Sequence, residues 1–341
     1  MSKKKRVTLR DVARQAGVSP TAVSFAYNAP HQLSQTTRER ILETADELGY
    51  QPHPVARTLA TGRTNTIGLV MPTSLDWILH DPLFSLILGE IGAVCDEEKM
   101  RILIVPAVGE VSPGMLATIA ADGFVLFSIH RNHPLGKVVE RINRPLVMIN
   151  CDENLRAPMF NVDDFRGAYL ACKHLLDKGH RRIAVGTIGP REDGVIIPTY
   201  ERRMLGYAAA VRDAGLPPST LRPVFIRGLL SMGVESFEKI WSLDPRPTAA
   251  LCVSDVRALG VLNGARKAGV VVPDDLAVVG FDNLPDSAVS TPPLTTLTQD
   301  LSGRMHLALR TLFALIADET NDDNPPPPHI TPMQLLVRES T

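Results

Sequence analysis

Residues 7–28 decide the fold of the N-terminal segment and read VTLRDVARQAGVSPTAVSFAYN. Four apolar residues at the start of this stretch recur at the i, i+3, i+4, i+7 spacing that places side chains on one face of a helix. They are Leu9, Val12, Ala13 and Ala16. The spacing predicts a short amphipathic helix that buries one side against a partner.

The residues around this helix indicate where it begins and which element comes next. Thr8 with Asp11 three positions later has the pattern of a capping box. Gly17 can adopt the left-handed conformation that ends a helix, and Ser19 followed by Pro20 suits the start of another. The sequence therefore predicts two helices joined by a tight turn, which is the helix-turn-helix arrangement.

A third helix is predicted to begin at Ser34 and to stop at Gly49. Ile41, Ala45 and Leu48 lie on its inner face at helical spacing. Three short helices of this kind form a minimal core.

Charge is divided unevenly along a chain whose 341 residues carry a formal net charge of −1. Residues 1–65 contain ten basic and five acidic side chains and so carry +5, which leaves −6 for the remainder. A basic segment on an acidic body is typical of a separate module that binds a polyanion. Because the second helix of a helix-turn-helix enters the major groove, we assign residues 1–50 to a small all-α DNA-binding headpiece.

Four segments in this order resemble the DNA-binding domain of the LacI/GalR family of bacterial repressors. They are residues 7–13 (VTLRDVA), 16–24 (AGVSPTAVS), 37–41 (TRERI) and 47–50 (ELGY). The resemblance implies a regulator that binds a pseudo-palindromic operator in double-stranded DNA.

The second helix is expected to turn its outward residues toward base edges. These candidates are Pro20, Thr21, Ser24, Phe25 and Asn28, of which Pro20, Thr21 and Phe25 match base-reading positions of the family. Phe25 stands where other members have Arg or His, and a phenyl ring cannot donate to guanine. We therefore expect this position to read a thymine methyl group or DNA shape.

Phosphate contacts are expected from hydroxyl groups, basic side chains and helix N-termini. The candidates are Thr8, Arg10, Ser19, Ser34 and Arg57, together with the basic run of residues 3–6.

Residues 51–64 contain about two turns of potential helix between Pro54 and Gly62, too short to be stable alone in water. The segment resembles the hinge helix of the family, which becomes ordered when two subunits meet on the minor groove. Leu59 matches the apolar side chain that this hinge inserts between base pairs, and Val55, Ala56 and Arg57 are the accompanying contacts. His53 replaces the Asn commonly found there.

From residue 65 on, strand-like apolar runs alternate with helical segments, as in residues 67–71, 83–98, 102–106 and 124–128. This alternation predicts an α/β fold of parallel sheets with helices on both faces. The chain is long enough for two such lobes.

Several stretches of the body resemble the effector-binding and dimerisation domain of the same family, which is built like a periplasmic sugar-binding protein. They are residues 81–84, 179–184, 203–207, 278–282 and 293–297. The resemblance implies three chain crossings between the lobes. We place the domain at 65–341, with the first lobe at 65–164 and 292–326 and the second at 165–291 and 327–341.

Ligands of open parallel sheets bind at the carboxyl ends of the strands. Polar residues follow three predicted strands, and others match pocket positions of the family. The candidate ligand-binding residues are Phe84, Asn150, Arg203, Ser254, Asp282 and Gln299. Trp77 and His80 occur in an unusually long loop before Asp81, and Trp77 could stack on a sugar. Asp255 is expected to cap the following helix.

Other classes of protein find little support. The chain lacks the GxxxxGK[ST], GxGxxG, GxSxG and HExxH motifs, so we expect no enzyme and no cofactor. Four widely separated cysteines and nine histidines show no metal-ligand spacing, and the cysteines are interpreted as buried apolar residues. With no apolar signal segment and no long apolar run, a cytoplasmic protein is expected rather than a transport receptor.

The sequence thus favours a sequence-specific transcriptional regulator, a homodimer whose operator affinity is controlled by a small effector between the lobes. A repressor responding to a sugar or sugar derivative is the first hypothesis. A corepressor-dependent repressor or an activator of the same family is the alternative, and a sugar-processing enzyme or solute receptor is a remote one. No Leu heptads occur near the C-terminus, so no tetramerising coiled coil is expected.

Overall fold

The computed structural model divides the chain into two compact units, Met1–Asn65 and Thr66–Thr341. Each unit is described by itself. The described residues are 7–52, 58–59, 61–109, 114–130, 132–139, 142–153, 155, 157–188, 197–226, 233–317 and 326–341.

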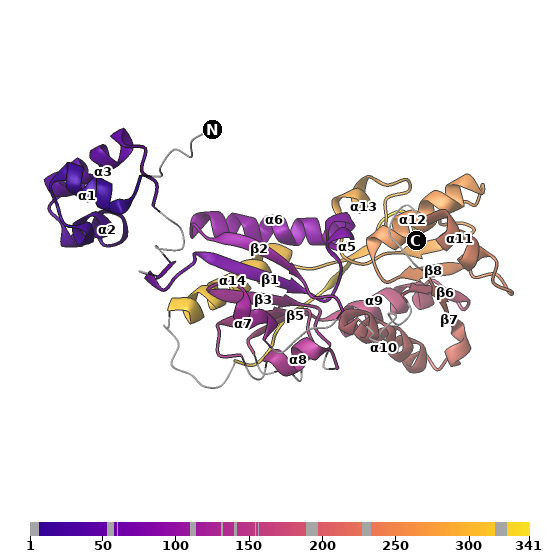
Figure 1. Cartoon of the computed structure of the whole chain (residues 1–341). Coiled ribbons are helices and arrows are strands. Elements are labelled where there is room, and N and C mark those ends of the chain that lie inside the picture. The colour runs from indigo at the N-terminus through magenta and orange to yellow at the C-terminus, as the bar shows by residue number, and fades with distance from the viewer. Residues whose placement is uncertain are drawn as a thin grey trace. The chain divides into compact units, whose positions relative to one another are not determined.

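The first unit contains the three predicted helices (Figure 1). They are α1 (Leu9–Ala16), α2 (Pro20–Asn28) and α3 (Gln35–Glu47), with a short 3₁₀ turn at Pro30–Gln32. Their buried core is made of small and branched apolar side chains, namely Val12, Ala13, Ala16, Val23, Ala26, Ile41 and Ala45. The helix-turn-helix prediction is confirmed in its elements.

The ends of these helices follow the predicted capping residues. The Asp11 carboxylate accepts a hydrogen bond from the Thr8 backbone N–H at 3.0 Å, which completes the capping box. Gly17 has φ +64°, so the chain leaves α1 in the left-handed conformation that glycine adopts without strain. Ser19 and Ser34 accept from backbone N–H groups at the starts of α2 and α3.

The first lobe of the second unit is built on a parallel six-stranded sheet of order β11-β5-β4-β3-β1-β2 (Figure 1). Its strands are β1 (Thr66–Met71), β2 (Arg101–Pro106), β3 (Gly123–Phe127), β4 (Leu146–Ile149), β5 (Met159–Val162) and β11 (His329–Thr331). Helices α6 (Pro82–Glu97) and α14 (Leu301–Ala317) pack on one face, and α7 (Met115–Thr118) and α8 (Pro134–Val139) on the other. The central strands are buried on both faces, which explains their near-continuous apolar sequences.

The second lobe contains a parallel four-stranded sheet of order β7-β6-β8-β9. Its strands are β6 (Ile183–Thr187), β7 (Leu221–Phe225), β8 (Ala249–Cys252) and β9 (Ala277–Val279). Helices α9 (Asp164–Asp177) and α10 (Pro198–Asp213) cover one face, and α11 (Gly233–Trp241) and α12 (Asp255–Lys267) the other. The α/β prediction with parallel sheets is confirmed.

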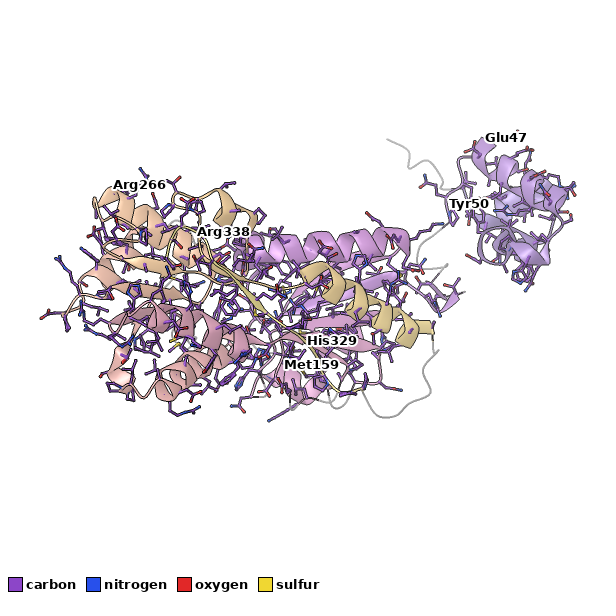
Figure 2. The ribbon with its side chains drawn as sticks, turned by 180° about the vertical axis from the view of Figure 1, so that it is seen from behind. Glu47, Tyr50, Met159, Arg266, His329 and Arg338 are labelled. Carbon is purple, nitrogen blue, oxygen red and sulfur yellow. The ribbon has the colours of Figure 1, made fainter. Side chains whose placement is uncertain are left out.

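The chain passes between the lobes through short strands. β10 (Thr296–Thr298) and β12 (Gln334–Leu336) form a two-stranded antiparallel sheet, and the neighbouring Leu297 and Met333 pack into the core of the second lobe. β11 pairs with β5 in the first lobe, where His329 lies opposite Phe160. Figure 2 labels His329 of β11 and Met159 of β5. The predicted lobe boundaries are therefore wrong at two places. At both of them, a segment that crosses between the lobes packs on the lobe other than the one predicted. Residues 329–331 pair with the first lobe, and 296–298 pack on the second.

Two segments have features that the sequence analysis above does not include. The long loop before Asp81 contains a helix, α5 (Leu75–His80), whose N-cap Ser74 accepts from the Trp77 N–H at 3.3 Å. The C-terminal stretch is a strand only at Gln334–Leu336, and it ends in a tail that carries the fully buried Ser340. The Ser340 hydroxyl donates to the Val278 carbonyl at 2.6 Å, so this tail completes the edge of the second lobe.

Candidate functional site

The candidate base-reading residues lie along α2. Pro20 and Thr21 are exposed, whereas Ser24, Phe25 and Asn28 are half-buried. The Asn28 Nδ2 group donates to the Ser24 hydroxyl at 3.4 Å, and the buried Asn28 Oδ1 has no hydrogen-bond partner among the described residues. The first turn of α2 is therefore its most accessible part, as contact with base edges requires.

The candidate phosphate contacts lie at helix starts. Thr8, Arg10, Ser19 and Ser34 are all exposed. The hydroxyls of Ser19 and Ser34 cap α2 and α3, so a bound phosphate would meet a hydroxyl next to free backbone N–H groups. Val55, Ala56, Arg57, His53 and the run 3–6 lie outside the described residues.

Leu59 is among the described residues of the hinge segment. Its side chain is 82% exposed, the largest exposure of any large apolar residue in the described part of the chain. An isolated exposed leucine is common on protein surfaces, but one in a segment that resembles a DNA-binding hinge suits an apolar wedge.

The described part of the first unit is not itself basic. It carries five arginines, Arg10, Arg14, Arg38, Arg40 and Arg63, and five carboxylates, Asp11, Glu39, Glu43, Asp46 and Glu47. The +5 charge of residues 1–65 therefore comes from residues 3–6 and Arg57.

The second unit contains a cavity of about 290 Å³ between the carboxyl ends of the strands of its two lobes. From the first lobe it is lined by Trp77, Asp81, Phe84, Phe127, Ser128, His130, His133 and Asn150, among others. From the second lobe it is lined by Ile197, Thr199, Tyr200, Arg203, Ser254, Val256, Arg257 and Asp282, among others. Polar groups at strand ends and aromatic walls fit a small polar ligand with apolar faces.

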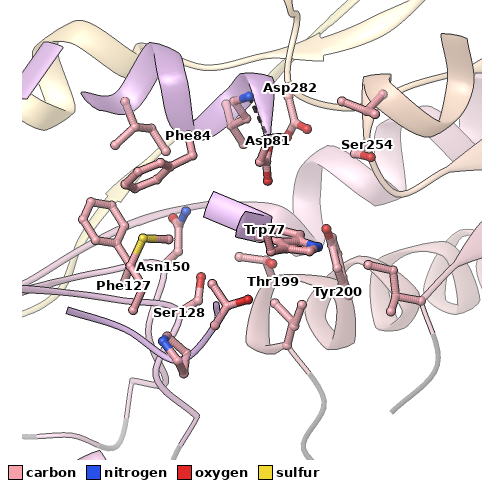
Figure 3. A pocket seen from close by; sticks show the side chains of 18 of the residues that line it. Trp77, Asp81, Phe84, Phe127, Ser128, Asn150, Thr199, Tyr200, Ser254 and Asp282 are labelled. Atoms are coloured by element: carbon pink, nitrogen blue, oxygen red, sulfur yellow. Dashed lines mark hydrogen bonds between the residues drawn. The ribbon is translucent and has the colours of Figure 1, made fainter. Parts of the chain in front are cut away.

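Aromatic side chains gather on two sides of this cavity (Figure 3). Phe84 and Phe127 pack edge to face with ring centroids 5.9 Å apart and lie on the same side as Asn150. Trp77, carried by α5, and Tyr200 also line the cavity and are drawn apart from Phe84 and Phe127 in this view. Such rings can pack on the C–H face of a sugar or on another flat group.

Arg203 lies at the centre of a buried ion network. Its Nε donates to Asp164 at 2.8 Å, its Nη2 to Asp282 at 3.4 Å, and its Nη1 to the Val253 carbonyl. The guanidinium also lies 3.5 Å from the centroid of the Phe281 ring. The residue predicted to contact a ligand is thus already engaged in ion pairs. Among the described residues these hydrogen bonds use three of its five N–H groups.

Asp282 and Asp81 are the carboxylates that line the cavity. Burial raises the pKa of Asp282 well above its ordinary value, although the Arg203 charge opposes this shift. Burial also raises the pKa of Asp81, against the backbone N–H groups of Leu83 and Phe84, which favour the carboxylate. Asp282 has φ +117° shortly after β9, and its side chain reaches Arg203 from there.

Ser254 and Asp255 follow β8. The Ser254 hydroxyl accepts from Arg257 Nη1 at 2.9 Å and lines the cavity. The start of α12 has no side-chain cap. The Asp255 carboxylate accepts instead from the Thr296 hydroxyl at 2.5 Å and the Leu284 N–H at 2.8 Å. The capping role predicted for Asp255 is therefore wrong, because partners from later segments of the chain take both oxygens.

Asn150 lines the cavity, but Gln299 is not among the lining residues. Both side-chain oxygens accept from Arg304, Asn150 Oδ1 at 2.6 Å and Gln299 Oε1 at 2.5 Å. Gln299 is therefore linked to the cavity through Arg304, which also binds Asn150. Sequence reasoning missed Arg304, Tyr200, Phe127, His130 and Arg257, because nothing at their positions distinguishes a pocket residue from a helical surface charge or a core aromatic.

Comparison with known proteins agrees with this architecture. Residues 8–53 match the family model of bacterial regulatory proteins, lacI family, and residues 172–341 match a periplasmic binding protein-like domain. The transcriptional repressor CytR of Escherichia coli (strain K12) is 32% identical over 301 residues, which cover 86% of this chain and 84% of that protein. The repressor PurR of Histophilus somni (strain 129Pt) is 30% identical over 322 residues, 92% and 93% of the two chains.

Solved structures of similar fold include two regulators. The Lac repressor dimer bound to operator and the anti-inducer ONPF has a TM-score of 0.81 at 25% identity, covering 99% of each chain. The regulator CelR in complex with cellobiose has a TM-score of 0.69 at 27% identity, covering 98% of this chain and all of that one.

A helix-turn-helix unit and a two-lobed α/β unit with a pocket between its lobes define a DNA-binding regulator with a small-molecule site. The chain belongs to the LacI family of bacterial regulatory proteins. Its relatives are transcriptional repressors, and it is a DNA-binding transcriptional repressor and not an enzyme. Within the described residues, no helix is long and apolar enough to cross a membrane.

Proposed function

We propose that this repressor binds a pseudo-palindromic operator as a homodimer and that a small effector in the interlobe cavity controls its operator affinity. The observation that supports this most strongly is the cavity itself. It joins strand ends of two lobes, so a ligand that contacts both lobes favours one relative arrangement of them. A bacterial repressor acts on chromosomal DNA, so the proposed function implies a cytoplasmic protein.

The proposed effector is a sugar or sugar derivative. Asp81 and Asp282 can accept from hydroxyl groups, Arg203 and Asn150 can donate, and Phe84 and Trp77 offer apolar faces, all of them lining the cavity. Cellobiose is bound by CelR, and the Lac repressor has been crystallised with ONPF and ONPG. A thermal-shift screen tests the proposal, because a ligand at 100 times its Kd adds about 2.7 kcal/mol of stability. If no sugar, sugar phosphate or glycoside stabilises the protein, the sugar proposal fails.

The proposed DNA contacts are those of the headpiece and hinge, namely Thr8, Arg10, Ser19, Pro20, Thr21, Ser24, Phe25, Asn28, Ser34, Val55, Ala56, Arg57 and Leu59. Two copies are required because one recognition helix reads one half-site, and a palindrome suits two-fold symmetry. The Lac repressor neighbour is a dimer on its operator. A stoichiometry of one chain per full operator would contradict the dimer.

The basic run of residues 3–6 should carry much of the salt dependence of DNA binding, because the described part of residues 1–65 carries no net charge. Replacing all four residues by glutamine should reduce the slope of log K against log salt by about 0.9 for each phosphate that is no longer neutralised. Operator titrations between roughly 50 and 200 mM salt measure this slope. A control with the exposed Arg266 and Lys267 of the second lobe replaced should keep it. An unchanged slope in the fourfold variant would show that other cations neutralise the phosphates.

A further inference from the structure

Arg304, near the start of α14, is a buried cation whose hydrogen bonds go to neutral oxygens. The residue is 1% exposed. Its guanidinium donates to Asn150 Oδ1 at 2.6 Å, to Gln299 Oε1 at 2.5 Å and to the Phe160 carbonyl at 3.4 Å. Its Nε has no hydrogen-bond partner among the described residues, and no described carboxylate makes a salt bridge with it. Burying a charge without a carboxylate partner lowers the stability of the fold, which indicates a role for Arg304 other than stability.

The chemistry of Arg304 determines the orientation of the Asn150 amide. Burial lowers the pKa of the Arg304 guanidinium to about 10, which still leaves it protonated at neutral pH. A protonated guanidinium donates hydrogen bonds and accepts none. The Asn150 atom that lies 2.6 Å from Arg304 Nη1 must therefore be the carbonyl oxygen, and the NH₂ group must point away from Arg304.

The NH₂ group of Asn150 is left for the cavity. Asn150 directly follows β4 with φ +56° and lines the cavity on the same side as Phe84 and Phe127 (Figure 3). No described residue accepts a hydrogen bond from its Nδ2. Asn161, in the neighbouring strand β5, provides a contrast because its Nδ2 donates to the Cys151 carbonyl at 3.0 Å inside the fold.

We infer that Arg304 is a positioning residue that presents Asn150 to the cavity as a hydrogen-bond donor, so that the effector carries an acceptor atom there. The acceptor is a carbonyl, carboxylate, ether or hydroxyl oxygen or an unprotonated ring nitrogen. An amide whose oxygen is bonded to a cation is also a stronger donor, since hydrogen bonds in a chain polarise one another. This deepens the proposed function and rests on it.

The donor at Asn150 and the acceptors elsewhere in the cavity together define how an effector is oriented. Asp81 and Asp282, the carboxylates that line it, accept hydrogen bonds and so face the donor groups of an effector. An effector with an N–H or ammonium group against Asn150 would leave two donors facing each other and would be rejected. The position thus selects effectors by polarity.

A double-mutant cycle tests the orientation without any effector or DNA. Asn150→Asp places a carboxylate against Arg304 and should leave the melting temperature unchanged or raise it. In an Arg304→Met background the same change leaves a half-buried carboxylate without its cation and should lower the melting temperature by roughly 5 °C more. Arg304→Lys keeps the positive charge, so Asn150→Asp should again have little effect on the melting temperature in this background. This variant separates the effect of the charge from that of the side-chain shape. It also replaces the Arg304→Met variant in the test if that variant fails to fold.

The matched control is Asn263, an exposed asparagine whose Oδ1 accepts from Arg266 Nη2 at 3.1 Å. Asn263→Asp should have nearly the same small effect in the parent and in an Arg266→Met background. If Asn150→Asp destabilises the parent and the Arg304→Met background equally, Arg304 does not hold the Asn150 oxygen and the inference is overturned.

A second measurement tests the donor that faces the cavity, with dimethyl sulfoxide as the probe because it only accepts hydrogen bonds. In protein labelled with ¹⁵N-asparagine, the Asn150 side-chain signal is identified by its loss in Asn150→Asp. We expect this signal to shift on titration with dimethyl sulfoxide and the buried Asn161 signal to stay in place. An Asn150 signal as unresponsive as that of Asn161 would overturn the inference. Both measurements leave effector and operator out, so failure of the proposed function would show separately.

Discussion

Replacing Leu59 by alanine is expected to weaken operator binding by roughly 10- to 100-fold, because a fully buried leucine side chain is worth about 1.5–3 kcal/mol. The side chain is 82% exposed in the free chain, so the substitution removes no packing from the fold. On DNA, an apolar wedge between base pairs would transfer this surface out of water. The loss should therefore appear in DNA affinity and leave the melting temperature of the second unit unchanged.

Fluorescence anisotropy with the preferred operator, at a single stated salt concentration, measures this effect. Leu205→Ala is the matched control, because Leu205 is a 56% exposed leucine of α10 and has no place in the proposed DNA contacts. It should bind operator as the parent does. Equal affinities of Leu59→Ala and parent would remove the wedge from the proposed mechanism.

Replacing Arg203 by methionine should destabilise the second unit by about 3–5 kcal/mol, since it removes one partner of a buried ion network. Asp282, whose side chain is 3% exposed, would lose its guanidinium partner inside the fold. The fully buried Asp164 would keep only its ion pair with Arg202, at 3.2 Å. Arg212→Met is the matched control on the same helix, because the Arg212 side chain is 75% exposed beside Asp213 and its removal should matter little.

The destabilisation in Arg203→Met should also depend on pH. Burial already holds the pKa of Asp282 above its ordinary value, and the Arg203 charge opposes that shift. Without Arg203 the pKa should rise further, so the folded state binds protons more tightly than the unfolded state and loses stability as pH rises above the ordinary carboxyl range. Melting temperatures should therefore show a larger deficit at pH 8 than at pH 5. A deficit that does not change with pH would mean that the carboxylates find other partners.

The sequence predicted the parts of the structure that local physics determines. Caps at Ser19 and Ser34, the glycine turn at Gly17 and the alternation of strands and helices all have short-range causes, and each is present. Polar residues at strand ends were expected in the cavity, and Asn150 and Asp282 line it, as does Ser254. Parallel strands bring their carboxyl ends together whatever the details of the loops.

The features that were missed depend on contacts distant in sequence. Arg304 resembles any basic residue of an amphipathic helix until α14 packs on the sheet and brings it to Asn150, 154 residues earlier. Gln299 follows the family pattern of a pocket residue, yet in this chain its oxygen is taken by Arg304. Helix α5 is too short for periodicity to reveal, although it carries Trp77 to the cavity.

The net charge of −1 is the sum of a basic N-terminal segment and an acidic remainder, and the structure shows which part of that segment is balanced in charge. The basic excess of residues 1–65 belongs to residues 3–6 and Arg57, and the described part of this segment carries no net charge. We therefore expect the exposed first turn of α2 to contact base edges and the basic run of residues 3–6 to provide most of the general attraction to DNA. The acidic remainder of the chain should discourage other surfaces from lying on DNA.

The central proposal is that one chain couples a cavity ligand to an operator, and operator titration with and without a cavity ligand tests it most directly. The ligand is the compound from the thermal-shift screen whose stabilisation is lost in Phe84→Ala. At saturation it should change operator affinity by about 5- to 150-fold, which corresponds to typical coupling free energies, and operator should change ligand affinity by the same factor. A decrease identifies an inducer and an increase a corepressor. An operator affinity that stays the same at saturating ligand would contradict the coupling of the two sites.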